Sequence, residues 1–321
     1  MNRYNRPGDE QPPLPKPYAF VPIPDAPMKP EKPTGHDHYE GDLLTGTITG
    51  SLVALSPIHV ASGAIELTGK LPSLVKAHFR CEGKPTIPGS SLKGAIRSIV
   101  EAISKPPSCL RISQARSDNL PPNVRRCLNK DQLCLACRMF GAMGYLGQVH
   151  FSDAVAQQSK TEIVQIPSLF PPRPRERVYY ERNKIVGRKF YMHGRDGKTA
   201  PGNVPTEVCP VGTTFSLRID FVNLSDAQLA LLLCALGQGA PKLTPKLGGG
   251  KPACCGSMET ANVAVATVSA SKSATDFELE PTEHDLAELT GATRQIDQTS
   301  VNRLAKILTF PGERDCPDRN Y

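Results

Sequence analysis

Apolar residues recur along the chain at two spacings, and each spacing predicts a different kind of element. One run has the i, i+4, i+7, i+8, i+11 spacing of a single helix face, and it consists of Leu92, Ile96, Ile99, Val100 and Ile103. The turn pair Pro88-Gly89 precedes this run, and Ser90 has the side chain of an N-cap. The pattern therefore predicts a helix over residues 90–104.

Alternation of apolar and polar residues predicts strands over residues 44–55, 74–80, 147–153, 213–222 and 257–268. Ser225 is the N-cap of a second predicted helix, which ends at Leu236 just before Gly237. A short amphipathic segment covers residues 301–308. Strands interleaved with well-marked helices predict an α+β fold in which helices pack on a sheet.

Composition divides the chain into three parts. Its 321 residues can bury a sizeable core, and its 31 Pro and 26 Gly predict many loops and insertions. Residues 1–42 are Pro-rich and polar, so we expect an extended arm. Residues 43–268 hold the predicted core, with insertions at 105–140 and 158–207, and residues 269–321 form a C-terminal extension.

Charge and cysteine usage narrow the class of protein. The formal net charge of +7 favours a polyanionic partner. The sequence has no signal-peptide core and no apolar stretch long enough to span a bilayer, so we expect a cytoplasmic protein without a membrane partner. In a reducing compartment, clustered cysteines indicate metal ligands rather than disulfides. We therefore interpret the remaining six cysteines as ordinary thiols: the adjacent Cys254 and Cys255, and the isolated Cys81, Cys209, Cys234 and Cys316.

Four cysteines do form a cluster with the spacing C-x17-C-x6-C-x2-C, namely Cys109, Cys127, Cys134 and Cys137. A Cys-x-x-Cys pair presents two thiolates to one ion, and two more cysteines complete a tetrahedral Zn²⁺ site. Because the protein fills all four positions, we expect structural zinc and no catalytic zinc. Buried thiols or a redox-active pair are the alternatives.

A basic insertion has the composition of a nucleic-acid contact. Residues 173–198 contain nine Lys or Arg and three Asp or Glu, with aromatic residues interleaved among them: Tyr179, Tyr180, Phe190 and Tyr191. Cations for phosphates and flat rings for stacking are what single-stranded nucleic acid needs. The candidate contacts are Lys184, Arg188 and Lys189. A solvated loop is the alternative.

Two further segments have features of phosphate sites. At the start of the first predicted helix, backbone N–H groups would lie beside the side chains of Ser90, Ser91, Lys93 and Arg97. The alternative is an ordinary N-capped helix with two solvated cations. After the second helix, consecutive glycines allow close approach of backbone to phosphate, in the run Gly248, Gly249, Gly250 and Lys251. Pro245 and Pro252 exclude a Walker A motif there.

The segment IHVASG at residues 58–63 places His59, Ser62 and Gly63 at a strand end. A histidine in such a position is catalytic, a ligand or structural. No Ser-His-Asp set and no carboxylate pair can be assembled around it.

These segments, in their order along the chain, resemble the RAMP superfamily: residues 58–63, IPGSSLKG at 87–94, FG at 140–141 with GQVHFSDA at 147–154, and GGGK at 248–251. More narrowly, they resemble the backbone subunits of type III CRISPR effector complexes. Residues 17–22 and 187–193 are similar to type III-D and III-E members, and the likeness covers residues 17–268.

The resemblance implies an RRM/ferredoxin-like core, an antiparallel sheet with helices on one face, and subunits that stack along a guide RNA. It implies that the helix start and the glycine loop grip guide phosphates, that residues 158–207 form a thumb, and that the cysteines belong to a zinc-binding insertion. The implied partners are the CRISPR guide RNA, complementary target RNA and other type III effector subunits.

One difference from that family bears on catalysis. Target-cleaving members carry an Asp in the loop after the His-x-x-Ser-Gly segment, whereas residues 64–74 contain no Asp, and their only carboxylate is Glu66. We therefore expect a guide-binding subunit that does not cleave, with no catalytic residue. The alternatives are a metal-dependent target-RNA endonuclease that uses Glu66, and a free-standing zinc-containing RNA-binding protein.

Overall fold

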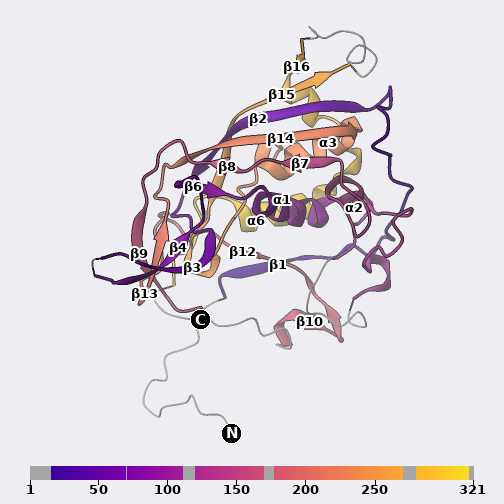
Figure 1. Cartoon of the computed structure of the whole chain (residues 1–321). Coiled ribbons are helices and arrows are strands. Elements are labelled where there is room, and N and C mark those ends of the chain that lie inside the picture. The colour runs from indigo at the N-terminus through magenta and orange to yellow at the C-terminus, as the bar shows by residue number, and fades with distance from the viewer. Residues whose placement is uncertain (1–15, 70, 111–119, 170–176, 270–279, 318–321) are drawn as a thin grey trace.

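A five-stranded antiparallel sheet forms the centre of the computed structural model, which describes residues 16–69, 71–110, 120–169, 177–269 and 280–317 (Figure 1). The strand order is β16-β15-β2-β14-β7. The strands are β2 (Leu44–Ala54), β7 (Val149–Phe151), β14 (Thr214–Leu224), β15 (Met258–Val268) and β16 (Thr282–His284). Each neighbouring pair is antiparallel.

Helices pack on one face of this sheet. Three of them contact its strands: α1 (Gly89–Ile103), α2 (Leu135–Phe140) and α3 (Asp226–Leu233). Behind these, α5 (Leu286–Thr290) packs on α3 and α6 (Gln298–Leu308) packs on α1. Along β14, Phe215, Leu217 and Ile219 are buried while Ser216 and Arg218 are exposed, as expected for a sheet with one covered face. The mixed α+β fold with antiparallel sheets, predicted from the sequence, is confirmed.

The central elements follow one another as β2, α1, β7, β14, α3 and β15, a β-α-β-β-α-β succession. Within it, the capping of α3 is as predicted, because Ser225 accepts a hydrogen bond from the backbone of Gln228 and the Gln228 side chain returns one to Ser225. The residues of α3 from Ala227 to Leu233 are all buried, so this helix is packed on every side.

A second sheet stands beside the first, in the order β3-β4-β13-β9. Its strands are β3 (Ala61–Leu67), β4 (Leu74–His78), β9 (Glu162–Ile166) and β13 (Val204–Val208). Residues 64–74, expected as a loop, lie at the outer end of the β3–β4 hairpin: residues 64–67 belong to β3 and Leu74 begins β4. The hairpin projects from the molecule (Figure 1). All of β3 is exposed.

Short elements complete the fold. The remaining strands are β1 (Tyr18–Pro22), β5 (Arg80–Cys81), β6 (Lys84–Ile87), β8 (Ala154–Val155), β10 (Tyr180–Glu181), β11 (Lys184–Ile185) and β12 (Gly187–Tyr191). Single turns of 3-10 helix occur at Pro122–Val124, Arg177–Tyr179, Lys251–Ala253 and Thr293–Gln295, and a π-turn occurs at Cys234–Gln238.

The N-terminal segment is held along the core of its own chain. Its strand β1 pairs with β12 of the basic insertion, with Val21 opposite Arg188. Further along, Glu31 forms a bridge with Leu133, beside the cysteine-bearing region. The segment therefore links two insertions that lie far apart in the sequence.

The predicted N-cap of α1 is wrong. The N-cap is Pro88, no side chain of the neighbouring sequence caps the helix, and Ser90 lies within its first turn. The carboxylate of Asp153 accepts a hydrogen bond from the Gly89 N–H at 2.7 Å instead. A residue 64 positions away in the chain thus satisfies one of the free N–H groups at the helix start.

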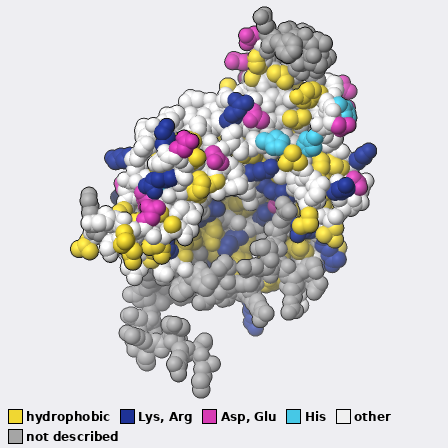
Figure 2. Space-filling model, in the orientation of Figure 1, with side chains coloured by type: hydrophobic (Ala, Val, Ile, Leu, Met, Phe, Trp, Pro, Cys, Tyr) yellow, Lys and Arg dark blue, Asp and Glu magenta, His cyan; other side chains and the backbone are white. Residues whose placement is uncertain are grey.

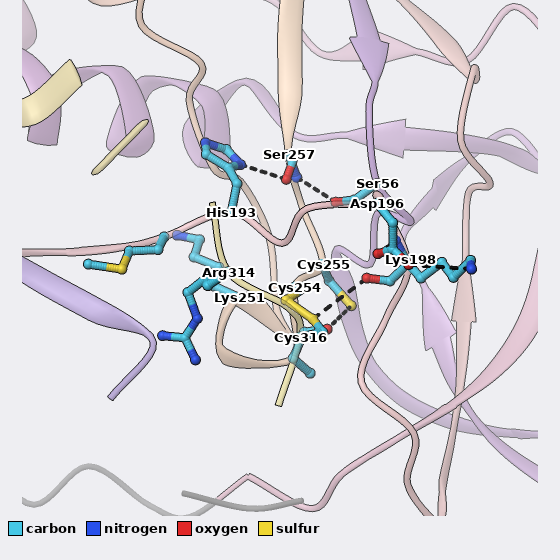
Figure 3. Close-up of a disulfide and its surroundings, with 12 residues drawn as sticks. Ser56, His193, Asp196, Lys198, Lys251, Cys254, Cys255, Ser257, Arg314 and Cys316 are labelled. Atoms are coloured by element: carbon cyan, nitrogen blue, oxygen red, sulfur yellow. Dashed lines mark hydrogen bonds and ion pairs between the residues drawn. A yellow bond between two sulfur atoms is a disulfide. The ribbon is translucent and has the colours of Figure 1, made fainter. Parts of the chain in front are cut away.

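The interpretation of Cys254 and Cys316 as ordinary thiols is also wrong, because the two form a disulfide with a Cα–Cα distance of 6.1 Å (Figure 3). The bond joins the C-terminal extension to the segment that follows the glycine loop. Cys255, next to Cys254, is a buried free thiol.

Replacing Asp153 by Ala should lower the free energy of unfolding by about 1 kcal/mol, the usual contribution of a helix N-cap. Urea unfolding followed by circular dichroism measures the change. The matched control is Asp42→Ala, an exposed carboxylate, which should stay within about 0.5 kcal/mol of the parent. Equal stability of the two variants would contradict the capping role.

Candidate nucleic-acid interface and metal centre

The four predicted metal ligands meet in one place. The sulfur atoms of Cys109, Cys127, Cys134 and Cys137 all lie within 4.8 Å of one another. Cys134 is the N-cap of α2 and Cys137 follows in its first turn, so the start of a short helix presents both sulfurs of the Cys-x-x-Cys pair. The four cysteines could hold a metal ion, and four sulfur donors fit the tetrahedral coordination of Zn²⁺.

Hydrogen-bond donors surround the sulfurs, as thiolate ligands require. The backbone N–H of Cys109 donates to Cys134 Sγ at 3.4 Å, and that of Cys134 donates to Cys127 Sγ at 3.3 Å. The pKa of the Cys134 thiol lies below its ordinary value because the three neighbouring cysteine side chains hydrogen-bond to it. The surroundings of this sulfur therefore favour its ionised form.

Arg97, predicted to bind phosphate, points to this cluster instead. Its guanidinium donates to Cys137 Sγ at 3.2 Å, to the Gly141 carbonyl at 2.7 Å and to the Glu101 carboxylate at 2.6 Å. The side chain is only 10% exposed. A guanidinium with all three nitrogens engaged inside the chain has no free donor face for guide RNA.

Two cations of the basic insertion are likewise engaged within the chain. Arg188 is buried and pairs with the second oxygen of Glu101. Lys189 places its ammonium between three rings, 4.7 Å from the centroid of Tyr18, 5.2 Å from Tyr179 and 4.9 Å from Tyr191. Of the three candidates in this insertion, only Lys184 is exposed.

Lys93 lies at the start of α1 and is the cation there that remains available. Across the described part of the chain it has no ion-pair partner. Partial burial, and to a smaller extent the charge of Arg97, lowers its pKa. It lines an open groove of about 300 Å³ together with Arg126, Tyr145 and Leu146. Figure 2 shows Lys and Arg side chains gathered in the middle of this face, over the region of α1.

Ser90 is exposed and Ser91 is half-buried, so the start of α1 presents hydroxyl groups near Lys93. Leu92 of the first turn and Leu247, directly before the glycine loop, line the same small apolar cavity. The two segments predicted to bind phosphate thus border one part of the core.

The glycine loop packs against His59. The N–H of Gly249 donates to the His59 carbonyl at 2.8 Å, and a Cβ on Gly248 would lie 2.3 Å from that carbonyl oxygen. Gly248 and Gly250 have φ of +78° and +68°, a backbone conformation that glycine adopts at no steric cost. The loop thus needs glycine for packing as well as for its backbone shape.

The imidazole of His59 is itself buried. Its Nδ1 lies 2.7 Å from the Glu207 carbonyl, and among the described residues its Nε2 has no hydrogen-bond partner. Burial lowers its pKa. This favours the neutral ring, which cannot attract a phosphate by charge.

Ser62, Gly63 and Glu66 are all exposed on β3. The Ser62 hydroxyl donates to the Ala77 carbonyl of β4 at 3.1 Å and accepts from the Ala64 N–H at 3.1 Å. Gly63 has a φ of +88°, where the pairing of β3 with β4 is irregular. Ser62 and Gly63 thus shape the hairpin, and Glu66 stands on its outer part.

Two cations near the proposed sites, Lys246 and Arg126, were not identified as candidates from the sequence. Lys246 is almost fully buried, donates to the Met192 carbonyl at 3.0 Å, and has its pKa lowered to about 7 mainly by burial. Arg126 lines the groove beside Lys93, although nothing in the polar segment around it predicts that position.

Lys251, the last residue of the glycine loop, is half-buried and has no ion-pair partner among the described residues.

Metal analysis of the purified protein should find about one zinc per chain. Cys134→Ser removes one of four ligands and should reduce the metal content strongly and make residues 105–140 sensitive to proteolysis, since this polar region depends on its metal. Cys81→Ser, at an exposed free thiol, is the control and should keep both metal and resistance. A folded, protease-resistant protein without metal would contradict the site.

Comparison with known proteins identifies the family of the chain. No helix in the described part of the chain is long and apolar enough to span a membrane. Among curated proteins, no sequence matches this chain. The model of the RAMP superfamily matches residues 51–259, which include the end of β2, α1, the cysteine cluster, the glycine loop and the start of β15. This match covers more than half of the sequence, and the chain therefore belongs to the RAMP superfamily.

Proposed function

We propose that this protein is a guide-RNA-binding subunit of a type III CRISPR ribonucleoprotein, acting in the cytoplasm with target RNA and other effector subunits as partners. The observation that carries the proposal is the RAMP superfamily match over residues 51–259, since this family is generally involved in CRISPR-associated RNA binding. The β-α-β-β-α-β succession supports an RRM/ferredoxin-like description of the core.

The guide backbone would run past the start of α1 and the glycine loop. Lys93 supplies an ammonium that has no ion-pair partner within the described ranges of the chain, and the nearby Ser90 and Ser91 supply hydroxyl donors. Lys251 lies at the end of the neighbouring loop. Phosphate contacts of this kind give affinity without sequence preference, as a subunit that accepts many guides requires.

Arg97 and Arg188 have no place in this interface, and the exposed Lys184 is the candidate contact of the insertion that we retain. The cysteine cluster would hold structural Zn²⁺ and order the region between α1 and β7. The proposed binding surface thus depends on cations that are exposed or half-exposed, separate from those that stabilise the fold.

We also propose that this subunit does not cut target RNA. The exposed β3–β4 hairpin has the position in the sequence at which cleaving members carry an Asp, and here its only carboxylate is Glu66. A single exposed carboxylate is a weak ligand for the metal that RNA cleavage needs.

Neutralising Lys93 should weaken guide binding and make it less dependent on salt. For single-stranded RNA, loss of one phosphate contact lowers the slope of log K against log[salt] by about 0.7. Fluorescence anisotropy of a labelled guide across a salt series measures affinity and slope for Lys93→Gln. Lys306→Gln on α6 is the control, because this exposed lysine lies outside the proposed interface. An unchanged slope in Lys93→Gln would remove this residue from the interface.

Incubation of the guide-loaded protein with complementary target RNA and Mg²⁺ should leave the target intact. Gel analysis of end-labelled RNA checks this outcome, and Glu66→Ala should give the same pattern as the parent. Regularly spaced cuts that disappear in Glu66→Ala would establish the endonuclease alternative.

A further inference from the structure

A buried chain of charges connects the cysteine cluster to the basic insertion. Arg97 uses three separate nitrogens: Nη2 donates to Cys137 Sγ, Nη1 to the Gly141 carbonyl, and Nε to Glu101. Gly141 is the C-cap of α2, the helix that presents Cys134 and Cys137. One guanidinium therefore fixes both ends of this helix against α1.

The charge of Arg97 matches what a metal-loaded cluster needs. Four thiolates around a divalent cation carry a net charge of −2, which is costly to bury without a compensating cation. The side chains of Arg97 and Glu101 are 10% and 3% exposed, so both lie in the low-dielectric interior. Backbone N–H groups reach Cys127 and Cys134, and Arg97 brings a full positive charge to Cys137.

Glu101 extends the chain of charges to a second element. Its other oxygen pairs with Arg188 of β12, whose side chain is 15% exposed. Arg188 faces Val21 in the two-stranded β1–β12 ribbon. A continuous series of side-chain contacts thus runs from Cys137 through Arg97 and Glu101 to Arg188. It connects a proposed metal ligand to the insertion that carries Lys184.

We propose that Arg97 is a positioning residue of the metal centre, and that through Glu101 it couples metal binding to the seating of strand β12. When the cluster binds Zn²⁺ and its thiols become thiolates, the added negative charge strengthens the hold on Arg97. Arg97 then holds Glu101 in the place where it receives Arg188. The proposal rests on metal binding by the cysteines and is independent of RNA binding.

The rate of metal release tests whether Arg97 is a positioning residue of the metal centre. Arg97→Lys keeps the positive charge, but its N–H donors all sit on one nitrogen and cannot replace donors that Arg97 spreads over three nitrogens of a planar fork. Transfer of zinc to the chromogenic chelator 4-(2-pyridylazo)resorcinol should be about 10- to 100-fold faster than in the parent. The control is Arg294→Lys, which alters an exposed pair with Asp226 and should release zinc at the parental rate.

Equal release rates for Arg97→Lys and the parent, with unchanged circular dichroism, would overturn the assignment. If Arg97→Lys does not fold, Glu101→Gln takes its place, because Glu101 contacts no sulfur yet holds the guanidinium. Faster zinc release in Glu101→Gln supports the proposal and an unchanged rate contradicts it.

Hydrogen exchange tests the coupling. In the parent, removal of zinc by the chelator should increase amide exchange in peptides covering Gly187–Tyr191. In Glu101→Gln these peptides should exchange faster even with zinc bound, and removal of zinc should add little. Two results would overturn the coupling. One is amide exchange in β12 of the parent that does not change when zinc is removed, and the other is an equal change on zinc removal in the parent and in Glu101→Gln. Because no RNA is present, either result leaves the proposed guide binding untouched.

Discussion

The contact of the Arg97 guanidinium with Cys137 Sγ, Glu101 and the Gly141 carbonyl is the interaction on which the surrounding structure depends. It joins α1, which packs under the central sheet, to α2, whose Leu135, Met139 and Phe140 are buried in the same core. Removal of one member of a buried charged network is costly, because its partners are left charged and unpaired. Arg97 therefore adds a polar connection between the cysteine cluster and α1 to the apolar packing of α2.

Burial also separates the cations of the chain into two groups. Arg97, Arg188 and Lys246 are desolvated and have partners inside the protein, so they contribute to the architecture. Lys93, Lys184 and Lys251 keep contact with solvent and have no ion pair among the described residues. Only the second group can exchange counterions for phosphates, and Lys93 lines the open groove beside the start of α1.

Periodicity predicted the regular elements well because it follows directly from burial on one face. The alternation that predicted a strand over 213–222 corresponds to β14, and the Ser225 cap was correct because its partner Gln228 is three residues away. The proximity of the four cysteines was predictable because their spacing in the sequence is typical of ligands to one ion.

Contacts between distant parts of the chain were not predictable in this way. Nothing local to Ser90 indicates that Asp153 caps α1, and nothing in a basic segment separates a buried Arg188 from an exposed Lys184. The Cys254–Cys316 disulfide spans 62 residues, and the expectation of a reducing compartment argued against any disulfide. Charge counts give the sign of a surface, whereas burial decides which of its charges remain there.

Photo-crosslinking with a guide RNA that contains 4-thiouridine reports which residues touch the RNA. We expect crosslinked peptides from the start of α1, around Lys93, and from the glycine loop at residues 248–251. Crosslinks confined to other surfaces, such as α6 and the C-terminal extension, with none at these two segments, would contradict it.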